Sequence, residues 1–394
     1  MKFLFITSSN IACNPRLFKE LQLALKLGHS CSVIQFQLGN WTDSKTNLLK
    51  KSLHNVQFIE FTALRNPFFQ WFYTSLIQKI LSFLPQTNLP IRLLAFSLSK
   101  RSIIINRFLK NNWGQYDWVI AHNPPSFYPA LVFSLKIRAK LGIDIEDYHP
   151  GETNDLKESR KMLRMMKTIM PKADYCSFAA PLIKEEVQKF ITHEFKEWVT
   201  ILNGFSKDEF NEPTEIKSKK LKVVWFSQNI APGRGLEKFI SVANKLHKEI
   251  ELHLIGDLSE KNKNLLLKYS KGVFIHLPMT QRDLHGFLSQ FDVGLAVETS
   301  KDLNNSIAVS NKILAYVQSG LYVIATPTPG QLSFLGGSNL NFSIVDLSDI
   351  EIEKCFSKLI KDKPKLIHKK LQFQRAKKFS WENINESLIN IWGN

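Results

Sequence analysis

The stretch that decides the fold is KFLFITSSNIACNPRLFKELQLALKLGHSCSVIQF, residues 2–36. It begins with a short apolar run that ends in polar residues, KFLFITSS (2–9). Between residues 16 and 27 the apolar side chains recur at helical spacing, and Gly28 then ends the helix before a second apolar run, CSVIQF. The face of that helix carries Leu17, Leu21, Ala24 and Leu25. The pattern predicts a β–α–β unit, the seed of a parallel sheet.

The same alternation of strands and helices continues through the chain. Further strands of the first half are expected at VQFIEF (56–61), DWVIAH (117–122), GIDIEDYH (142–149), 175–179 and WVTILNG (198–204). Residues 205–220 are polar, contain Pro213 and lack periodicity, which is typical of a linker. A second series follows at LKVVWFS (221–227), IELHLIGD (250–257), VFIHLP (273–278), FDVGLAVE (291–298), LYVIATP (321–327) and FSIVDL (342–347).

The expected architecture is therefore α/β, with two tandem Rossmann-like, doubly wound domains that face a central cleft. A chain of 394 residues is long for one hydrophobic core, which agrees with two domains. The boundaries are placed at residues 1–205 and 206–378, and residues 379–394 are expected to form a helix that packs back on the first domain. Doubly wound sheets bind ligands beyond the carboxyl ends of their strands, so each domain would supply half of a site.

Composition narrows the classes of partner. The formal net charge is +17 with a pI of about 9.6, which favours phosphate-bearing ligands, an anionic membrane or a polyanion. The pattern lacks the helix-turn-helix, zinc and RNP signatures that accompany nucleic-acid binding, so nucleic acid is not expected. The four cysteines have no C-x-x-C spacing, and the sequence has no stretch of membrane-spanning length or signal peptide. We expect a cytoplasmic protein.

Two segments of the second half have the chemistry of anion sites. In WFSQNIAPGRGLEKFI (225–240), Gly233 and Gly235 allow close backbone approach, and Arg234 between them supplies a planar fork of donors at the start of a helix. The alternative is a tight turn with a surface arginine, because neither a Walker nor a G-x-G-x-x-G pattern is present. In VSNKILAY (309–316), Ser310 and Asn311 precede a helix whose first turn holds Lys312 rather than an acidic residue. The alternative there is a capped helix with an exposed lysine.

Taken in order along the chain, these motifs resemble the family 4 glycosyltransferases of the GT-B fold. APGRGLE with LHLIGD, then SNKILAY with YVIATPTPGQ, resembles the nucleotide-sugar half of that family. CNPRLFKEL, DWVIAHNPP, DIEDYHPGE and WVTILNGFSKDEF resemble segments of the acceptor half. The resemblance implies a retaining transfer of sugar from a nucleoside-diphosphate sugar, without a metal or other cofactor, to a glycan or lipid-linked glycan in cell-surface polysaccharide synthesis.

The resemblance also assigns residues. Catalytic roles fall to His149, Arg234 and Lys312. The donor would be bound by Gly233, Arg234, Gly235, Ser310, Asn311, Lys312, His276, Leu277, Pro278 and Glu298. The acceptor would be bound by Asn10, Arg16, His122, Asp147 and Glu152, with Glu146 a further candidate and Asp147 an alternative partner for the His149 ring.

The sequence departs from the family in two places. Ala315 occupies the position of the glutamate that holds the ribose, and apolar Ile307 stands near the earlier glutamate, so Glu298 is the candidate substitute. The N-terminal Gly-Gly loop is replaced by Ser8, Ser9 and Asn10. These changes leave open a non-catalytic nucleotide-sugar-binding or membrane scaffold protein, and a nucleotide-sugar epimerase of similar fold.

Residues 61–110 contain no acidic residue and seven basic ones: Arg65, Lys79, Arg92, Lys100, Arg101, Arg107 and Lys110. Two helices with broad apolar faces are expected here, at residues 66–85 and 91–110. One interpretation is peripheral contact with an anionic membrane on the inner face of the plasma membrane. The other is a pair of buried helices with a solvated basic edge.

Overall fold

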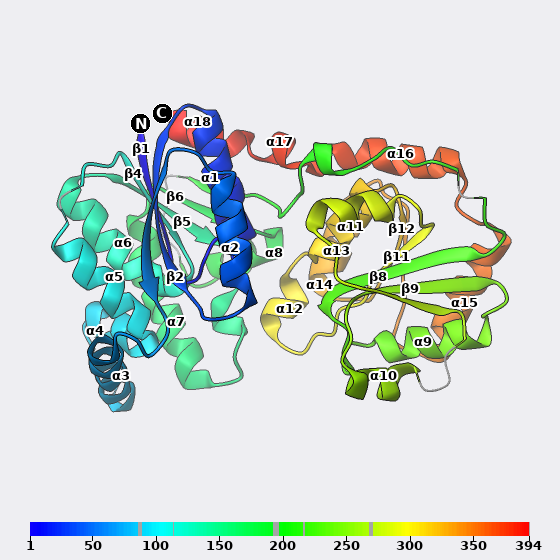
Figure 1. Ribbon diagram of the computed structural model, residues 1–394, viewed down its shortest axis with the longest axis horizontal. Helices are drawn as coiled ribbons and strands as arrows, with labels where there is room; N and C mark the ends of the chain where they lie inside the picture. Colours follow the sequence, from blue (N-terminus) through cyan, green and yellow to red (C-terminus); the bar gives the residue numbers. More distant parts are fainter. Residues whose placement is uncertain (86–88, 113, 192–196, 216, 268–270, 394) are drawn as a thin grey trace. The chain divides into compact units, whose positions relative to one another are not determined.

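The computed structural model describes residues 1–394 except 86–88, 113, 192–196, 216, 268–270 and 394. The chain divides into two compact units, Met1–Thr200 and Ile201–Asn394. Each unit is a parallel sheet with helices on both faces (Figure 1). In the first unit α1 and α2 lie on one face and α5 and α6 on the other; in the second, α11 and α13 lie opposite α9 and α10.

The first unit contains a seven-stranded sheet in the order β3-β2-β1-β4-β5-β6-β7. Its strands are β1 (Lys2–Thr7), β2 (Ser30–Gln37), β3 (Val56–Thr62), β4 (Trp118–His122), β5 (Lys140–Ile145), β6 (Tyr175–Phe178) and β7 (Trp198–Thr200). Its helices are α1 (Pro15–Lys26), α2 (Trp41–Lys51), α3 (Phe68–Phe83), α4 (Ile91–Leu98), α5 (Lys100–Lys110), α6 (Pro124–Ile137), α7 (Leu156–Ile169) and α8 (Pro181–Gln188), with short 3-10 turns η2 (His149–Gly151) and η3 (Met170–Lys172). The strand order reverses between β1 and β4, the point at which doubly wound sheets bind ligands.

The second unit contains a six-stranded sheet in the order β10-β9-β8-β11-β12-β13, which reverses between β8 and β11. Its strands are β8 (Leu221–Asn229), β9 (Ile250–Asp257), β10 (Val273–His276), β11 (Val293–Ala296), β12 (Tyr322–Ala325) and β13 (Phe342–Ile344). Its helices are α9 (Leu236–Lys245), α10 (Glu260–Leu267), α11 (Gln281–Leu288), α12 (Leu303–Ile307), α13 (Asn311–Gln318), α14 (Pro329–Gly336), α15 (Asp349–Lys361), α16 (Leu366–Ala376), α17 (Trp381–Ile384) and α18 (Glu386–Gly393), with η4 (Lys207–Glu209) and η5 (Lys377–Phe379). The predicted pair of doubly wound α/β units is confirmed.

Burial on both faces explains why the strands are continuous apolar runs. Central strands of a parallel sheet are covered by helices on each side, so adjacent residues are both buried. In β1 every residue from Phe3 to Thr7 is buried. In the second unit Trp225 of β8 and Tyr316 of α13 are almost fully buried. The Tyr316 ring packs over Gly294 of β11, where an added Cβ would meet the ring at 2.2 Å, and its hydroxyl donates to Leu295 O at 3.3 Å.

Several expected elements differ in extent. The strand expected at 142–149 ends at Ile145, and residues 149–151 form a 3-10 turn that contains Pro150. The strand expected at 198–204 ends at Thr200. The helix expected over 91–110 is broken at Ser99, which instead caps α5 by accepting from Arg101 N at 3.2 Å. The C-terminal helix is likewise two pieces, α17 and α18.

Among the described residues no helix is both long enough and apolar enough to cross a bilayer.

Candidate functional site

The two segments with anion-site chemistry lie beyond the carboxyl ends of neighbouring strands. The glycine turn follows β8 and leads into α9, while Glu298 follows β11 and α13 begins at Asn311. Strands β8 and β11 are hydrogen-bonded neighbours on either side of the strand-order reversal. The parallel topology therefore brings both segments to the same edge of one sheet, at its switch point.

The turn before α9 needs glycine at two positions. Gly233 and Gly235 have φ values of 82° and 76°, in the left-handed region that glycine enters without strain. A Cβ on Gly235 would also lie 2.8 Å from Leu347 and 3.0 Å from Val297, whereas Gly233 faces open space. Arg234 between them is exposed and donates from Nη1 to Ser227 Oγ at 2.6 Å. The turn thus presents an arginine and the N-terminal amides of α9 at the sheet edge, where the Glu237 carboxylate accepts from Gly233 N.

Lys312 has an anion already beside it within the unit. Its Nζ lies 2.6 Å from Glu298 Oε1, and Ser310 Oγ donates to the same oxygen at 2.9 Å. Ser310 also caps α13 by accepting from Lys312 N at 3.3 Å. The ammonium lies 6.0 Å from the centre of the buried Trp225 ring, a cation–π contact. Lys312, Ser310 and Glu298 form one cluster, which the sequence did not reveal because Glu298 and Lys312 come from different elements.

The cluster includes Glu298, the candidate substitute for the glutamate that is expected to hold the ribose. Ala315, where the resemblance expects a glutamate, is fully buried, and Ile307 is almost so. Glu298 is the carboxylate that the structure places beside α13, and its Oε1 is engaged by Lys312 and Ser310. Asn311, the first residue of α13, is exposed.

The third donor segment begins with His276, the last residue of the edge strand β10. The His276 ring stacks on His253 of β9, with its Nε2 2.9 Å from His253 Nδ1. Burial lowers the pKa of His276, and burial together with the facing His276 ring lowers the pKa of His253 to about 4. Both rings are therefore neutral at pH 7. Leu277 and Pro278 beyond them are exposed, Leu277 by 82%.

In the first unit three expected acceptor ligands, Asn10, Arg16 and His122, are buried rather than presented to solvent. Asn10 is 1% exposed, and its side-chain amide donates to Thr42 Oγ1 at 2.9 Å and to Asp43 Oδ1 at 3.2 Å. Arg16 and His122 are 1% and 0% exposed. All three side chains contact other polar residues at the carboxyl edge of the first sheet.

Arg16 and His122 belong to a buried charge cluster of four side chains. Arg16 donates to Asp144 from Nε at 2.8 Å and from Nη2 at 2.6 Å. The His122 ring lies between two carboxylates, with Nε2 3.2 Å from Glu20 Oε2 and Nδ1 3.3 Å from Asp144 Oδ2. Ser177 Oγ also donates to Asp144, at 2.6 Å. Sequence reasoning missed Glu20 and Asp144, although a carboxylate in the apolar strand GIDI and another at i+4 from Arg16 signal buried pairing.

Electrostatics inside this cluster favour the charged forms of three of its members. Burial would lower the pKa of His122, but Glu20 and Asp144 outweigh it and raise the pKa to about 9. Burial opposes ionisation of Asp144, yet Arg16 and His122 hold its pKa far below the ordinary range. Burial raises the pKa of Glu20 against the pull of His122. Burial and the Asp147 carboxylate raise the pKa of nearby Glu146 to about 7.

His149 lies just after this cluster, in the 3-10 turn η2. Its Nδ1 is 2.7 Å from Glu152 Oε2, and the His149 side chain is 9% exposed. The carboxylate beside Nδ1 is thus that of Glu152, expected to bind the acceptor, while Asp147 contributes its backbone carbonyl to His149 N at 2.9 Å. A carboxylate at Nδ1 orients the ring and leaves Nε2 as the atom available to a ligand.

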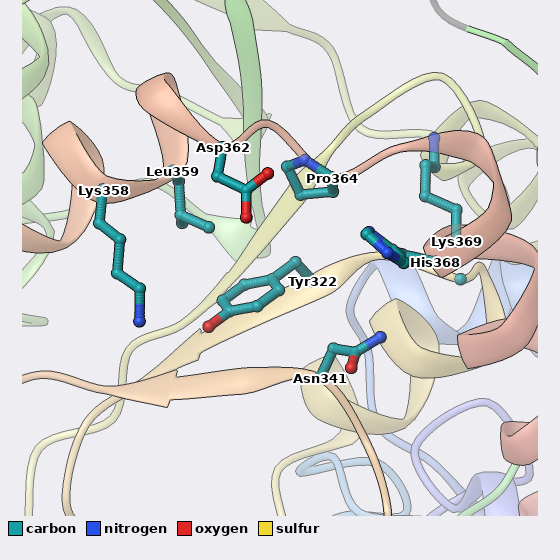
Figure 2. Close-up of a pocket in the computed structure, with 9 residues that line it drawn as sticks. Tyr322, Asn341, Lys358, Leu359, Asp362, Pro364, His368 and Lys369 are labelled. Carbon is teal, nitrogen blue, oxygen red and sulfur yellow. The ribbon is translucent and has the colours of Figure 1, made fainter.

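A separate cavity of about 260 Å³ lies in the second unit at the amino ends of β12 and β13 (Figure 2). Tyr322, Lys358 and His368 are among the residues that line it. Tyr322 donates to Phe342 O at 2.8 Å, and the Lys369 ammonium donates to Phe291 O at 2.7 Å. This edge is opposite to the one that carries Arg234 and Lys312, so the cavity is not part of the candidate site. Among the described residues no group of three His, Cys, Asp or Glu side chains is arranged to hold a metal ion.

Comparison with known proteins shows the fold. No protein-family model matches the chain, and no curated protein matches its sequence. Among solved structures, HepE (Alr3699) of Anabaena in complex with UDP and glucose is similar, with 14% identity over 100% of both chains and a TM-score of 0.67. Sucrose-phosphate synthase of Thermosynechococcus elongatus has 13% identity over 100% of this chain and 98% of its own, with a TM-score of 0.67. S. aureus TarM, in complex with UDP among other ligands, has 12% identity over 100% of both chains and a TM-score of 0.66. The chain has the GT-B fold.

Proposed function

We propose that the protein is a glycosyltransferase that moves a sugar from a nucleoside-diphosphate sugar to a glycan or lipid-linked glycan acceptor. One observation carries the proposal: the Gly233–Gly235 turn with Arg234 and the N-terminus of α13 with Lys312 share one edge of a doubly wound sheet, at its switch point. Two helix amide ends and two cations suit a diphosphate better than a single phosphate. Solved structures of the same fold hold UDP and UDP-glucose, which supports a nucleotide-sugar donor.

In this proposal the second unit stabilises the leaving group. When the bond between the anomeric carbon and the phosphate oxygen breaks, negative charge grows on the distal phosphate. Arg234, Lys312 and the N-terminal amides of α9 and α13 would neutralise that charge, the role that a divalent metal has in other transferases. We therefore propose a metal-independent reaction. Lys312 would exchange Glu298 for the phosphate, and the released carboxylate would be free to accept from the ribose hydroxyls.

The first unit would supply the sugar and acceptor contacts. His149 is oriented by Glu152 and would donate from Nε2 to the donor sugar. Asp147 and exposed parts of Glu152 remain the proposed acceptor contacts, since Asn10, Arg16 and His122 are buried. Retention of configuration, a role in cell-surface polysaccharide synthesis and a cytoplasmic location at the membrane face complete the proposal.

The first prediction tests the diphosphate machinery. Arg234→Ala and Lys312→Ala should each lower turnover of the donor by about 10²–10³-fold, the usual effect of removing one charge-stabilising group. The measurement is release of nucleoside diphosphate from a panel of UDP-, GDP- and ADP-sugars with a mixed acceptor panel. Lys263→Ala on α10 is the matched control and should leave turnover unchanged.

Unchanged turnover in both variants would contradict the proposed glycosyltransferase function. Donor binding with no sugar release across the panel would favour a non-catalytic protein, for which fully buried Ala315 is the supporting observation. Conversion of the donor sugar in the absence of any acceptor would instead indicate an epimerase.

A further inference from the structure

Helix α3 of the first unit leaves most of its apolar surface uncovered. The helix, FFQWFYTSLIQKILSF, has 16 residues, of which only Thr74 and Leu81 are buried. Phe69 is 85% exposed and Phe83 is 77% exposed. Other exposed apolar side chains on the helix are Phe68, Phe72, Tyr73, Leu76 and Ile80. In Figure 1 α3 lies at the lower end of the first unit, beside α4. Large exposed apolar patches on a folded protein mark interaction sites.

The neighbouring helices show that this exposure is specific to α3. Helix α4 buries Leu94 and Phe96, and α5 buries Ile103, Ile104, Ile105 and Leu109. The interpretation of residues 61–110 as buried helices with a basic edge therefore describes α4 and α5. It does not describe α3, whose aromatic residues other than half-buried Trp71 are exposed.

A groove of about 650 Å³ adjoins the exposed face, within the size range of small-molecule sites. Its walls come from β3, α3 and α5, and its lining is mainly apolar: Phe61, Phe69, Tyr73, Ile103, Ile104 and Phe108. Phe61 and Phe108 pack edge to face, with ring centres 5.4 Å apart, on one wall of the groove. Arg107, Asn111 and Asn112 also line the groove, and Arg107 is exposed. The groove thus combines an apolar lining with an exposed cation.

The charged residues of the segment that carries α3, α4 and α5 are all of one sign. Residues 61–110 contain seven basic residues and no acid, and Arg107 makes no ion pair among the residues that the structure describes. Arg65 and Lys100 both lie over the Trp71 ring, at 5.2 Å and 5.1 Å. Burial, with Arg101 and Arg65 nearby, lowers the pKa of Lys100, as expected where cations crowd without an anion. The charge complements an anionic partner and opposes pairing with a second copy of the same face.

We propose that the groove between α3 and α5 holds the hydrocarbon chain of a phosphate-headed lipid of an anionic bilayer, with Arg107 beside the headgroup. The exposed aromatic side chains of α3 then lie in the interfacial layer, where such rings are favoured, and the basic residues meet the anionic surface. This inference stands apart from the sugar-transfer proposal, because a non-catalytic protein could use the same surface. It assigns the membrane contact to the exposed face of α3, to the groove between α3 and α5, and to Arg107 beside the headgroup.

Two probes test the proposal on the full chain. The first is decyl phosphate below its micelle concentration, measured by calorimetry against decyl maltoside, which has a similar chain and a neutral head, and against inorganic phosphate. Decyl phosphate should bind with one site per chain, more tightly than either comparison ligand. Arg107→Gln should weaken it by about fivefold or more, the loss expected for one cation beside an anionic head.

The second probe is sedimentation with vesicles of phosphatidylglycerol and phosphatidylcholine, compared with phosphatidylcholine alone. The wild-type protein should bind the anionic vesicles and be released by salt. The double variant Phe72→Ser/Phe83→Ser, which changes the face but not the groove lining, should lose vesicle binding and keep decyl phosphate binding. Lys26→Gln on α1 is the matched control. Equal binding to neutral vesicles, or no effect of Arg107→Gln on decyl phosphate, would overturn the proposal. So would a dimer that the aromatic double variant dissociates, because α3 would then be an interface between copies.

Discussion

Lys312 stands in the first turn of α13, where the helix dipole disfavours a cation, and Glu298 supplies the compensating charge at 2.6 Å. The pair is partly exposed, with 14% and 26% of the two side chains accessible, so its net stabilisation is small. A weak internal counterion is one that an incoming phosphate can displace. The sequence predicted the need for an anion here but not that Glu298 provides it in the absence of a donor.

The second prediction follows from that competition. Glu298→Gln removes the carboxylate from the Lys312 ammonium and should tighten binding of inorganic pyrophosphate, which has no ribose. The expected gain is up to about fivefold, corresponding to the roughly 1 kcal/mol upper range for such pairs. Calorimetric titration of wild type and variant checks it, with Glu260→Gln on α10 as the control. A weaker affinity for pyrophosphate in Glu298→Gln would show that Glu298 is needed to position Lys312 rather than competing for it.

The third prediction concerns the buried cluster around Asp144. The pKa of His122 in the folded protein, about 9, lies above its ordinary value of 6.5. The stability contributed by protonated His122 is therefore complete below about pH 6.5 and is lost as the pH rises through about 9. Chemical denaturation should show the free energy of unfolding falling over this range, by at most about 1.4 kcal/mol per pH unit from this group. His122→Gln should remove that part of the slope; an unchanged slope would mean that His122 is neutral in the folded protein.

At the scale of the element, the turn between β8 and α9 is fixed by backbone conformation. Gly233 and Gly235 both have left-handed φ values, but only Gly235 is closely surrounded, by Leu347 and Val297. The two glycines therefore form an internal comparison between backbone strain alone and strain combined with a steric clash.

The fourth prediction uses that comparison. Gly233→Ala should cost about 1–2 kcal/mol of unfolding free energy, the penalty for a side chain in the left-handed region. Gly235→Ala should cost more, because its Cβ would lie within 3.0 Å of two side chains, and it should also weaken diphosphate binding by shifting the start of α9. Urea unfolding and pyrophosphate titration give the two readouts. Equal losses of unfolding free energy at the two positions would show that the Leu347 and Val297 side chains can move aside with little penalty.

Element by element, the sequence predicted most strands and the start of α9 but not every boundary. Continuous apolar runs such as Phe3–Thr7 are diagnostic because both faces of the sheet are covered. The break between α4 and α5 was missed, since Ser99 can either continue a helix or cap one, and tertiary packing decides. The burial of Asn10, Arg16 and His122 was missed for a related reason: polar residues at strand ends are equally typical of sites and of buried networks. The partners Glu20 and Asp144 lie far from His122 in sequence, and only the sheet brings them together.

At the scale of the whole molecule, the two units share the doubly wound fold but differ in the residues at the edges of their sheets and on their surfaces. The first unit carries a buried charge cluster at the carboxyl edge and an apolar, basic surface on α3. The second carries two helix N-termini, an arginine and a lysine at its switch point. We propose that part of the net charge of +17 binds a diphosphate and that another part meets an anionic bilayer.

The central claim is that a nucleoside diphosphate binds at the N-termini of α9 and α13, and hydrogen–deuterium exchange of the full chain tests it most directly. Exchange is compared without ligand and with UDP, GDP or ADP, choosing the nucleotide that most raises the thermal transition of the protein. We expect slower exchange at the amides of residues 233–237 and 310–314, and loss of that protection in the double variant Arg234→Ala/Lys312→Ala. Protection confined to other segments, or protection of these two that persists in the double variant, would contradict it.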